Sequence, residues 1–176
     1  MNTTPMVKVY GTESCHKSNY YKNFLTDSGV SYEFLEVELN KENAEELRRL
    51  YENRKLNFPT ITIGEKKLRN PNIEELDAWL NKLIPSRLTI EHDRSKKEFT
   101  LNINGAIAKV MYSLSNGNMC LNHSEVPFSL RGQGIGKVLV EKTFKKLTEE
   151  NYKAVAVCSY IKAIARRSKK WNAVIG

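Results

Sequence analysis

One cysteine lies between a strand-like segment and a helix-like segment, in the stretch GTESCHKS (11–18). A cysteine at the start of a helix faces free backbone N–H groups and the positive end of the helix dipole, and both favour the thiolate. Lys17 adds a nearby positive charge, whereas Glu13 opposes it. Ser18 occupies the position at which a redox pair carries its second cysteine. The stretch therefore predicts a single reactive thiol at Cys15, with an inert buried cysteine as the alternative.

A second candidate site is the glycine-rich stretch RGQGIG (131–136), which directly precedes a helix-like segment. Glycines let a turn expose consecutive backbone N–H groups, and the helix dipole favours an anion there. A pyrophosphate group suits such a site. The stretch follows antiparallel strands, which argues against a Rossmann unit, because there it would follow the first strand of a parallel sheet.

Two further side chains are candidates for acid–base or nucleophilic chemistry. Cys158 ends the apolar run AVAVC (154–158), and His123 ends an earlier strand-like segment. Adjacent strands would bring them to one reacting group despite their separation in sequence. Cys158 is then a candidate nucleophile or proton donor, Tyr160 is another candidate acid, and His123 is a candidate base. The alternatives are a packed thiol at Cys158 and a structural hydrogen bond at His123.

Charge divides the chain into two parts. Residues 1–85 carry 12 Lys and Arg against 13 Asp and Glu, whereas residues 86–176 carry 16 against 7. A basic half attracts polyanions such as nucleic acid, an acidic membrane or a phosphate-rich cofactor, although a solvated basic surface is an equal alternative. The three cysteines are widely spaced and odd in number, which favours a reducing, cytoplasmic location. We expect no metal site, no membrane span and no signal peptide.

The first part alternates between strand and helix patterns. Its predicted order is βαβαββα, and Asn72 is expected to cap the last helix. The strands are expected at 7–10, 32–39, 60–63 and near 68, with helices between them. The segment IPSR (84–87) ends the last helix, so we predict domains at 1–85 and 86–176.

The second part begins with an antiparallel meander. Its strands are expected at 88–91, 98–103, 106–114 and 119–123, with Gly and Asn in the turns. Cys120 lies within the last of these and is predicted to be part of the core. A helix follows the glycine-rich stretch, the run 154–158 is predicted to be a buried central strand, and a basic helix covers about 161–170.

The motifs of the first part resemble those of the glutaredoxins, and within them the mycoredoxin-like group. The matching segments are VKVYGTESCHKS, NFPTITIG and LRNPNIEEL, within about residues 6–83. The resemblance implies a thioredoxin fold in which Pro59 is cis beside Cys15. It also implies that Phe58 bonds a bound thiol peptide, and that Arg69 and Asn70 hold one end of glutathione.

Ser18 departs from the CxxC pattern of dithiol members. A second thiol would attack the mixed disulfide, and a serine cannot. The resemblance then implies a monothiol route in which free glutathione resolves the adduct on Cys15. The sequence CHKS also differs from the CGFS of monothiol members that carry iron–sulfur clusters. Cluster binding and a redox-inactive domain are the alternatives.

The motifs of the second part resemble those of the GNAT acetyltransferases, and within them a short single-domain group. The matching segments are HSEVPFSLRGQGIG and AVAVCSYIKAIARR, within about residues 87–175. The resemblance implies an α+β domain with a mainly antiparallel sheet that binds acetyl-CoA. It implies that Val126 lies on the strand edge that pairs with the pantetheine arm. The residues expected to cradle the pyrophosphate are Arg131, Gly132, Gln133, Gly134, Ile135, Gly136 and Lys137.

Together these resemblances imply an α/β protein with two active domains. One would exchange glutathione at Cys15, and the other would transfer acetyl from acetyl-CoA to an amine or thiol that the sequence does not define. A non-catalytic sensor or adaptor, binding acetyl-CoA and reporting redox state through Cys15, is the alternative. Another hypothesis is that Cys15 reduces a CoA or glutathione adduct on Cys158. Small thiols, acetyl-CoA and a protein substrate are the expected partners. Nucleic acid is not expected, because no helix-turn-helix or aromatic platform is present.

Overall fold

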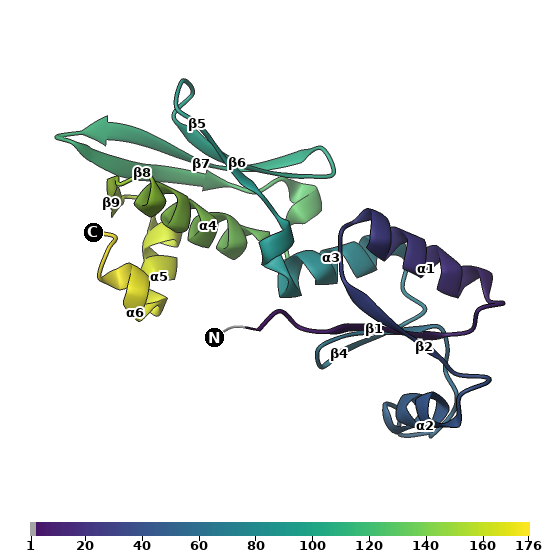
Figure 1. The fold of residues 1–176 in the computed structure, drawn as a ribbon. Coiled ribbons are helices and arrows are strands. Elements are labelled where there is room, and N and C mark those ends of the chain that lie inside the picture. The colour runs from purple at the N-terminus through teal and green to yellow at the C-terminus, as the bar shows by residue number, and fades with distance from the viewer. Residues whose placement is uncertain (1–2) are drawn as a thin grey trace. The chain divides into compact units, whose positions relative to one another are not determined.

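The computed structural model describes residues 3–176 and contains two compact units. The first ends at Arg87 and the second covers Leu88–Gly176. The predicted domain boundary lies two residues before the division between the units. Each unit has its own sheet, and Figure 1 shows the helices that cover each one.

The first unit has the strand order and directions of a thioredoxin fold, as expected. Its sheet has the order β2-β1-β3-β4, in which β1 pairs parallel with β2 and antiparallel with β3, and β3 pairs antiparallel with β4. Its elements are β1 (Val7–Gly11), α1 (His16–Asp27), β2 (Tyr32–Glu36), α2 (Lys41–Arg49), β3 (Thr60–Ile63), β4 (Lys66–Arg69), α3 (Ile73–Leu83) and the 3-10 turn η1 (Pro85–Arg87).

Helices cover both faces of this sheet. The helices α1 and α3 pack on one face, and α2 packs on the other (Figure 1). Leu25 of α1 and Leu76 and Leu80 of α3 are fully buried, because their spacing places them on one side of each helix. Asn72 accepts a hydrogen bond from the Glu75 backbone N–H, so the predicted cap of α3 is confirmed.

The second unit contains a five-stranded sheet that is mainly antiparallel. Its order is β5-β6-β7-β8-β9, and only the β8–β9 pair is parallel. Its elements are β5 (Ile90–Asp93), β6 (Glu98–Ile103), β7 (Ala106–Ser115), β8 (Asn118–Glu125), η2 (Phe128–Leu130), α4 (Ile135–Glu149), β9 (Lys153–Ala156), α5 (Ser159–Arg167) and α6 (Lys169–Asn172). The helices lie on one face of the sheet (Figure 1).

The structure of the second unit corrects three predictions. The run 154–158 is not a buried central strand, because β9 is the last strand of the sheet and Val155 and Val157 are exposed. Cys120 is half-buried on the face away from the helices and is not part of the core. The basic segment forms two helices, because Ser168 has an extended backbone and caps α6.

A buried histidine links the first strand of the second unit to the C-terminal end of α4. The Nδ1 atom of His92, on β5, lies 2.5 Å from Oε2 of Glu150, which ends α4. Its Nε2 atom lies 2.7 Å from the hydroxyl of Tyr112, on β7. The His92 ring also stacks on Phe99. These contacts fix the C-terminal end of α4 against the sheet, and α4 begins at the glycine-rich stretch.

We expect Glu150→Gln to destabilise the second unit at neutral pH and much less in acid. Burial alone would raise the pKa of the Glu150 carboxyl, but His92 and Arg94 together hold it below its ordinary value of 4.5. Such a carboxylate stabilises the fold above its unfolded pKa and loses this contribution as the pH falls through the folded pKa. We expect a loss of about 1–3 kcal/mol at neutral pH.

Urea unfolding monitored by fluorescence measures this effect. Trp79→Phe leaves Trp171, in the second unit, as the reporting tryptophan. The matched control is Glu149→Gln, which removes the adjacent, more exposed carboxylate that pairs with Lys145. An equal loss at neutral and acid pH would contradict the role of the Glu150 charge.

None of the helices between residues 3 and 176 combines the length and the apolar composition that crossing a membrane requires. Over the same residues, no group of three or more His, Cys, Asp and Glu side chains is arranged to hold a metal ion.

Candidate functional site

The first candidate site is the Cys15 thiol at the beginning of α1. Cys15 occupies the N-cap position with an extended backbone, and its thiol is partly exposed. The Ser18 hydroxyl lowers the pKa of this thiol most; burial opposes it, and the backbone N–H groups of Ser18 and Lys17 and the Lys17 charge lower it further. Glu13 forms an ion pair with Lys22 at 2.8 Å, which offsets the unfavourable effect of its negative charge on a thiolate at Cys15. The site therefore favours a thiolate.

The residues that the sequence assigned to glutathione lie at the same end of the first sheet. The Phe58–Pro59 peptide is cis, and the Asn70 backbone N–H donates to the Pro59 carbonyl at 3.0 Å. Lys17 Nζ donates to Asn70 Oδ1 at 2.9 Å, which connects the start of α1 to this segment. The side chain of Arg69 is exposed. A thiol peptide bound at Cys15 would thus meet exposed cationic and amide groups.

The second candidate site is a cavity of about 630 Å³ in the second unit. Its wall combines the end of β8, the glycine-rich stretch and the start of α5. The lining residues are His123, Ser124, Glu125, Val126, Leu130, Arg131, Gly132, Gly134, Ile135, Gly136, Cys158, Ser159 and Tyr160. Side chains from three separate parts of the sequence therefore meet at one cavity.

The strands β8 and β9 separate at this cavity. Their pairing runs from Asn118↔Lys153 to Leu121↔Ala156, and the N–H groups of Val157 and Cys158 both donate to the Leu121 carbonyl at 3.0 Å. Beyond this point β8 continues to Glu125 and pairs with β7 alone, because the chain after Ala156 turns into α5. The last part of β8 therefore presents a free edge that an extended amide-containing ligand can pair with.

Glycine is favoured at several points of the loop across the cavity. Gly132 and Gly134 have φ values of +76° and +78°, in the left-handed region that favours glycine. A Cβ at Gly136 would lie 2.6 Å from the Tyr160 hydroxyl oxygen, so a side chain there would displace the exposed Tyr160 ring. The first N–H groups of a helix have no carbonyl partner within the helix, so the loop and the start of α4 have the geometry that favours an anion.

Comparisons with known proteins agree with this geometry. Residues 98–174 match the family GCN5-related N-acetyl-transferase, and residues 7–68 match the family Glutaredoxin. Protein NATD1 of Danio rerio is 33% identical over 95 residues, which cover 52% of this chain and 86% of that protein. Protein NATD1 of Homo sapiens is 33% identical over 84 residues, covering 46% and 74% respectively.

The chain belongs to the GCN5-related N-acetyltransferase (GNAT) family. Its first unit contains a glutaredoxin domain. Among solved structures, a thioredoxin-like protein is 28% identical with a TM-score of 0.38, and covers 43% of this chain and 99% of its own. A GCN5-like protein from Staphylococcus aureus is 27% identical with a TM-score of 0.39, and covers 51% of this chain and 88% of its own.

Cys158 is the N-cap residue of α5 in the GNAT domain and lies on the cavity wall. Burial would raise the pKa of its thiol, but the backbone N–H groups of Ile161 and Tyr160 and the Ser124 hydroxyl and backbone together hold it below the ordinary value. His123 lines the same cavity and is exposed. Tyr160 also lines it, so the cavity contains all three residues that the sequence proposed for chemistry in this domain.

Three of the residues expected to bind acetyl-CoA, namely Val126, Gln133 and Lys137, are not placed as the sequence predicted. Val126 follows the last residue of β8 and is not part of the strand, although its carbonyl accepts from Arg131 Nε at 3.1 Å. Gln133 donates to the Ser129 carbonyl at 2.8 Å and is absent from the cavity wall. Lys137 lines a smaller cavity together with Arg167. Its Nζ atom forms an ion pair with Oε1 of Glu141 at 3.9 Å.

Four of the lining residues were not candidates from the sequence: Ser124, Glu125, Leu130 and Ser159. Two of them bear directly on the chemistry of the cavity. Ser124 acts on the Cys158 thiol, and Glu125 supplies a carboxylate to the wall. The β8 register pairs His123 with Met111 and Leu121 with Tyr112, which leaves Asn122 as an extra residue. This bulge changes which side chains face the cavity, and alternation along the strand does not reveal it.

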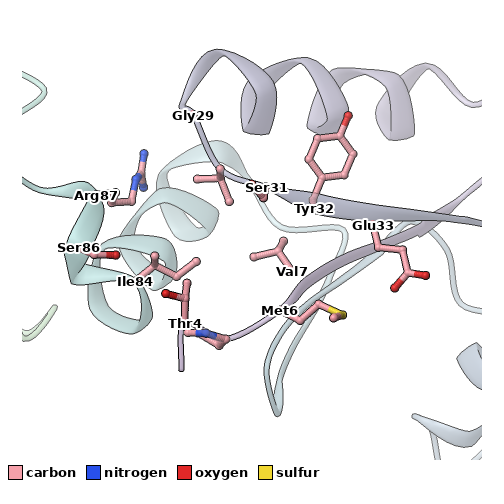
Figure 2. A pocket seen from close by; sticks show the side chains of 12 residues that line it. Thr4, Met6, Val7, Gly29, Ser31, Tyr32, Glu33, Ile84, Ser86 and Arg87 are labelled. Atoms are coloured by element: carbon pink, nitrogen blue, oxygen red, sulfur yellow. The ribbon is translucent and has the colours of Figure 1, made fainter. Parts of the chain in front are cut away.

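The first unit also contains a cavity, of about 800 Å³, but it is remote from Cys15. Figure 2 shows residues from the beginning of β1 and β2, the turn after α1 and the end of α3 around it. Cys15 follows the opposite end of β1. Arg87 lines this cavity, yet its guanidinium is held by Asp77 and Asn81 at 2.9 and 3.0 Å. The cavity therefore does not belong to the thiol site.

Proposed function

We propose that this protein has two activities: glutathione-dependent thiol–disulfide exchange at Cys15, and acetyl transfer from acetyl-CoA in the GNAT-domain cavity. The acetyl acceptor is an amine or a thiol. The observation that carries the second activity is the free edge of β8, which faces the glycine-rich loop across a cavity that also contains Cys158. The thiolate-favouring position of Cys15 supports the first activity.

Exchange at Cys15 follows a monothiol route. The Cys15 thiolate attacks the glutathione sulfur of a mixed disulfide, a new sulfur–sulfur bond forms, and the substrate leaves as its thiolate. A second glutathione thiolate then attacks the bound glutathione sulfur, and oxidised glutathione leaves while Cys15 is restored as a thiolate. Ser18 has no sulfur to compete with this second step.

In the GNAT domain, the chain's own groups would bind and orient acetyl-CoA. They would also accept a proton from the acceptor and donate one to the departing CoA. The loop N–H groups would hold the pyrophosphate, and the β8 edge would pair with the amides of the pantetheine arm. Bound in this way, acetyl-CoA would supply its acetyl group to the acceptor, and CoA would leave as a thiolate. His123 or Glu125 would accept the proton of the attacking acceptor, and Cys158 or Tyr160 would protonate the departing CoA thiolate.

Cys158 also allows a two-step route. Its thiolate would attack the acetyl carbonyl, CoA would leave as a thiolate, and the acceptor would then take the acetyl group from Cys158. The lowered pKa of the Cys158 thiol and the contact with Ser124 support this route.

A second candidate function is a sensor that binds acetyl-CoA without turnover. The exposure of His123 favours it, because a general base is normally held in one orientation by a partner. In the sensor, glutathione on Cys15 would report the redox state while the GNAT domain reports acetyl-CoA.

Native mass spectrometry of the full chain with oxidised glutathione and acetyl-CoA tests the proposal. We expect one covalent glutathione, which is lost in Cys15→Ser and retained in the control Cys120→Ser, and one non-covalent acetyl-CoA. A covalent acetyl on Cys158 would favour the enzyme over the sensor. Retention of neither ligand would overturn both activities. The same experiment tests whether Cys15 reduces an adduct on Cys158. If the Cys15→Ser variant loses glutathione from Cys158 as fast as the wild type does, the two thiols act separately.

A further inference from the structure

The Ser18 hydroxyl is buried without a hydrogen-bond partner of standard geometry. Ser18 is 0% exposed, and its Oγ is the buried side-chain oxygen or nitrogen that lacks such a partner among residues 3–176. Leaving a buried hydroxyl unpaired costs free energy, so such groups call for an explanation. We therefore asked whether this hydroxyl forms its hydrogen bond in another state of the protein, such as the one in which Cys15 is a thiolate.

The backbone holds this hydroxyl in place. Gly11 ends β1 directly against Ser18, and a Cβ at Gly11 would collide with both Oγ and Cβ of Ser18. The absence of a side chain at Gly11 is thus what makes room for the serine. Because both residues are buried, the hydroxyl has little freedom to turn toward water.

The helix start directs the hydroxyl toward Cys15. Cys15 is the N-cap of α1 and Ser18 is its third helical residue. In a capping box the side chain at this third position turns back toward the N-cap residue, so Ser18 is placed to reach the start of the helix. In this chain the N-cap atom is a sulfur. Of the groups that shift the pKa of the Cys15 thiol, the Ser18 hydroxyl has the largest effect, and it favours the thiolate. Its position in the helix and this effect on the pKa together make the Cys15 sulfur the candidate acceptor for the buried hydroxyl.

We propose that Ser18 is a positioning residue that donates its hydroxyl hydrogen bond to the Cys15 thiolate, so that the serine maintains a reactive thiol without supplying a resolving one. This inference rests on the exchange proposed at Cys15. A thiolate accepts this bond better than the neutral sulfur of a mixed disulfide. The bond therefore strengthens when Cys15 leaves as a thiolate, which assists release by an incoming glutathione.

The rate of Cys15 alkylation by iodoacetamide, followed across the titration of the thiol, tests this role. Peptide mapping separates Cys15 from Cys120 and Cys158. In Ser18→Ala we expect the apparent pKa of Cys15 to rise by about one unit, which corresponds to about a tenfold loss of thiolate below the pKa. Ser18→Gly removes the same hydroxyl and should give the same shift. The control is Ser14→Ala, an exposed hydroxyl one residue before Cys15.

An unchanged pKa in both Ser18 variants would overturn the role of Ser18. Alkylation requires no glutathione, so this outcome is distinct from failure of the exchange activity. If the wild type takes no glutathione but the pKa still rises in Ser18→Ala, the hydroxyl acts as proposed and the exchange activity is wrong.

Discussion

Replacing Ser18 with cysteine is expected to convert the glutathione adduct on Cys15 from a persistent species into a transient one. Residue 18 lies one helical turn after Cys15, its side chain is buried, and its hydroxyl is the group that lowers the pKa of the Cys15 thiol most. A thiol at this position can attack Cys15 in the mixed disulfide, form an intramolecular disulfide and release glutathione as a thiolate. We expect the fraction of protein carrying glutathione to fall by about tenfold or more.

Mass spectrometry after incubation with oxidised glutathione measures this fraction, and peptide mapping locates the adduct. The matched control is Ser14→Cys, which adds a thiol next to Cys15 but on the exposed side of the helix start. We expect this control to retain glutathione as the wild type does. If Ser18→Cys also retains it, the side chain at position 18 does not reach the Cys15 sulfur, and the role proposed for Ser18 would fail with it.

The folds of the two units were predictable because the local sequence patterns of their helices and strands agree with the observed order of elements in each unit. Asn72 and the Leu76/Leu80 stripe define α3 by local pattern alone, and the order βαβαββα follows from such segments. The error at 154–158 came from interpreting an apolar run as a doubly covered strand. Val155 and Val157 are exposed because helices cover only one face of this sheet, and a local sequence pattern does not report that.

The candidate sites were predictable where backbone geometry requires particular residues. Gly132 and Gly134 have positive φ values, which favour glycine, so the sequence pattern indicates the loop. Ser124 and Glu125 were not, because their positions follow from the bulge at Asn122. In the sequence Ser18 indicates only the loss of a thiol. The role proposed for its hydroxyl depends on burial against Gly11, which only the packing reveals.

Replacing Cys158 with alanine is expected to reduce acetyl transfer by about 100-fold or more while acetyl-CoA affinity changes little. The thiol lies on the cavity wall, where the start of α5 and Ser124 lower its pKa. The groups proposed to bind the ligand are the loop N–H groups and the β8 edge, and neither includes the Cys158 side chain. Loss of the thiol should therefore affect the chemical step and leave binding intact.

Release of CoA from acetyl-CoA, measured by chromatography with hydroxylamine as a small acceptor, gives the rate, and calorimetry with acetyl-CoA gives the affinity. The matched control is Cys120→Ala, which removes a half-buried thiol on the outer face of β8. If the rate in Cys158→Ala stays within about twofold of the wild type, Cys158 is not part of the mechanism, and Tyr160→Phe then tests the remaining proton donor. If affinity falls as much as the rate, Cys158 contributes to binding and not to the chemical step. A rate loss with unchanged affinity is the result that a group acting only in the transition state produces, because such a group stabilises no ground-state complex.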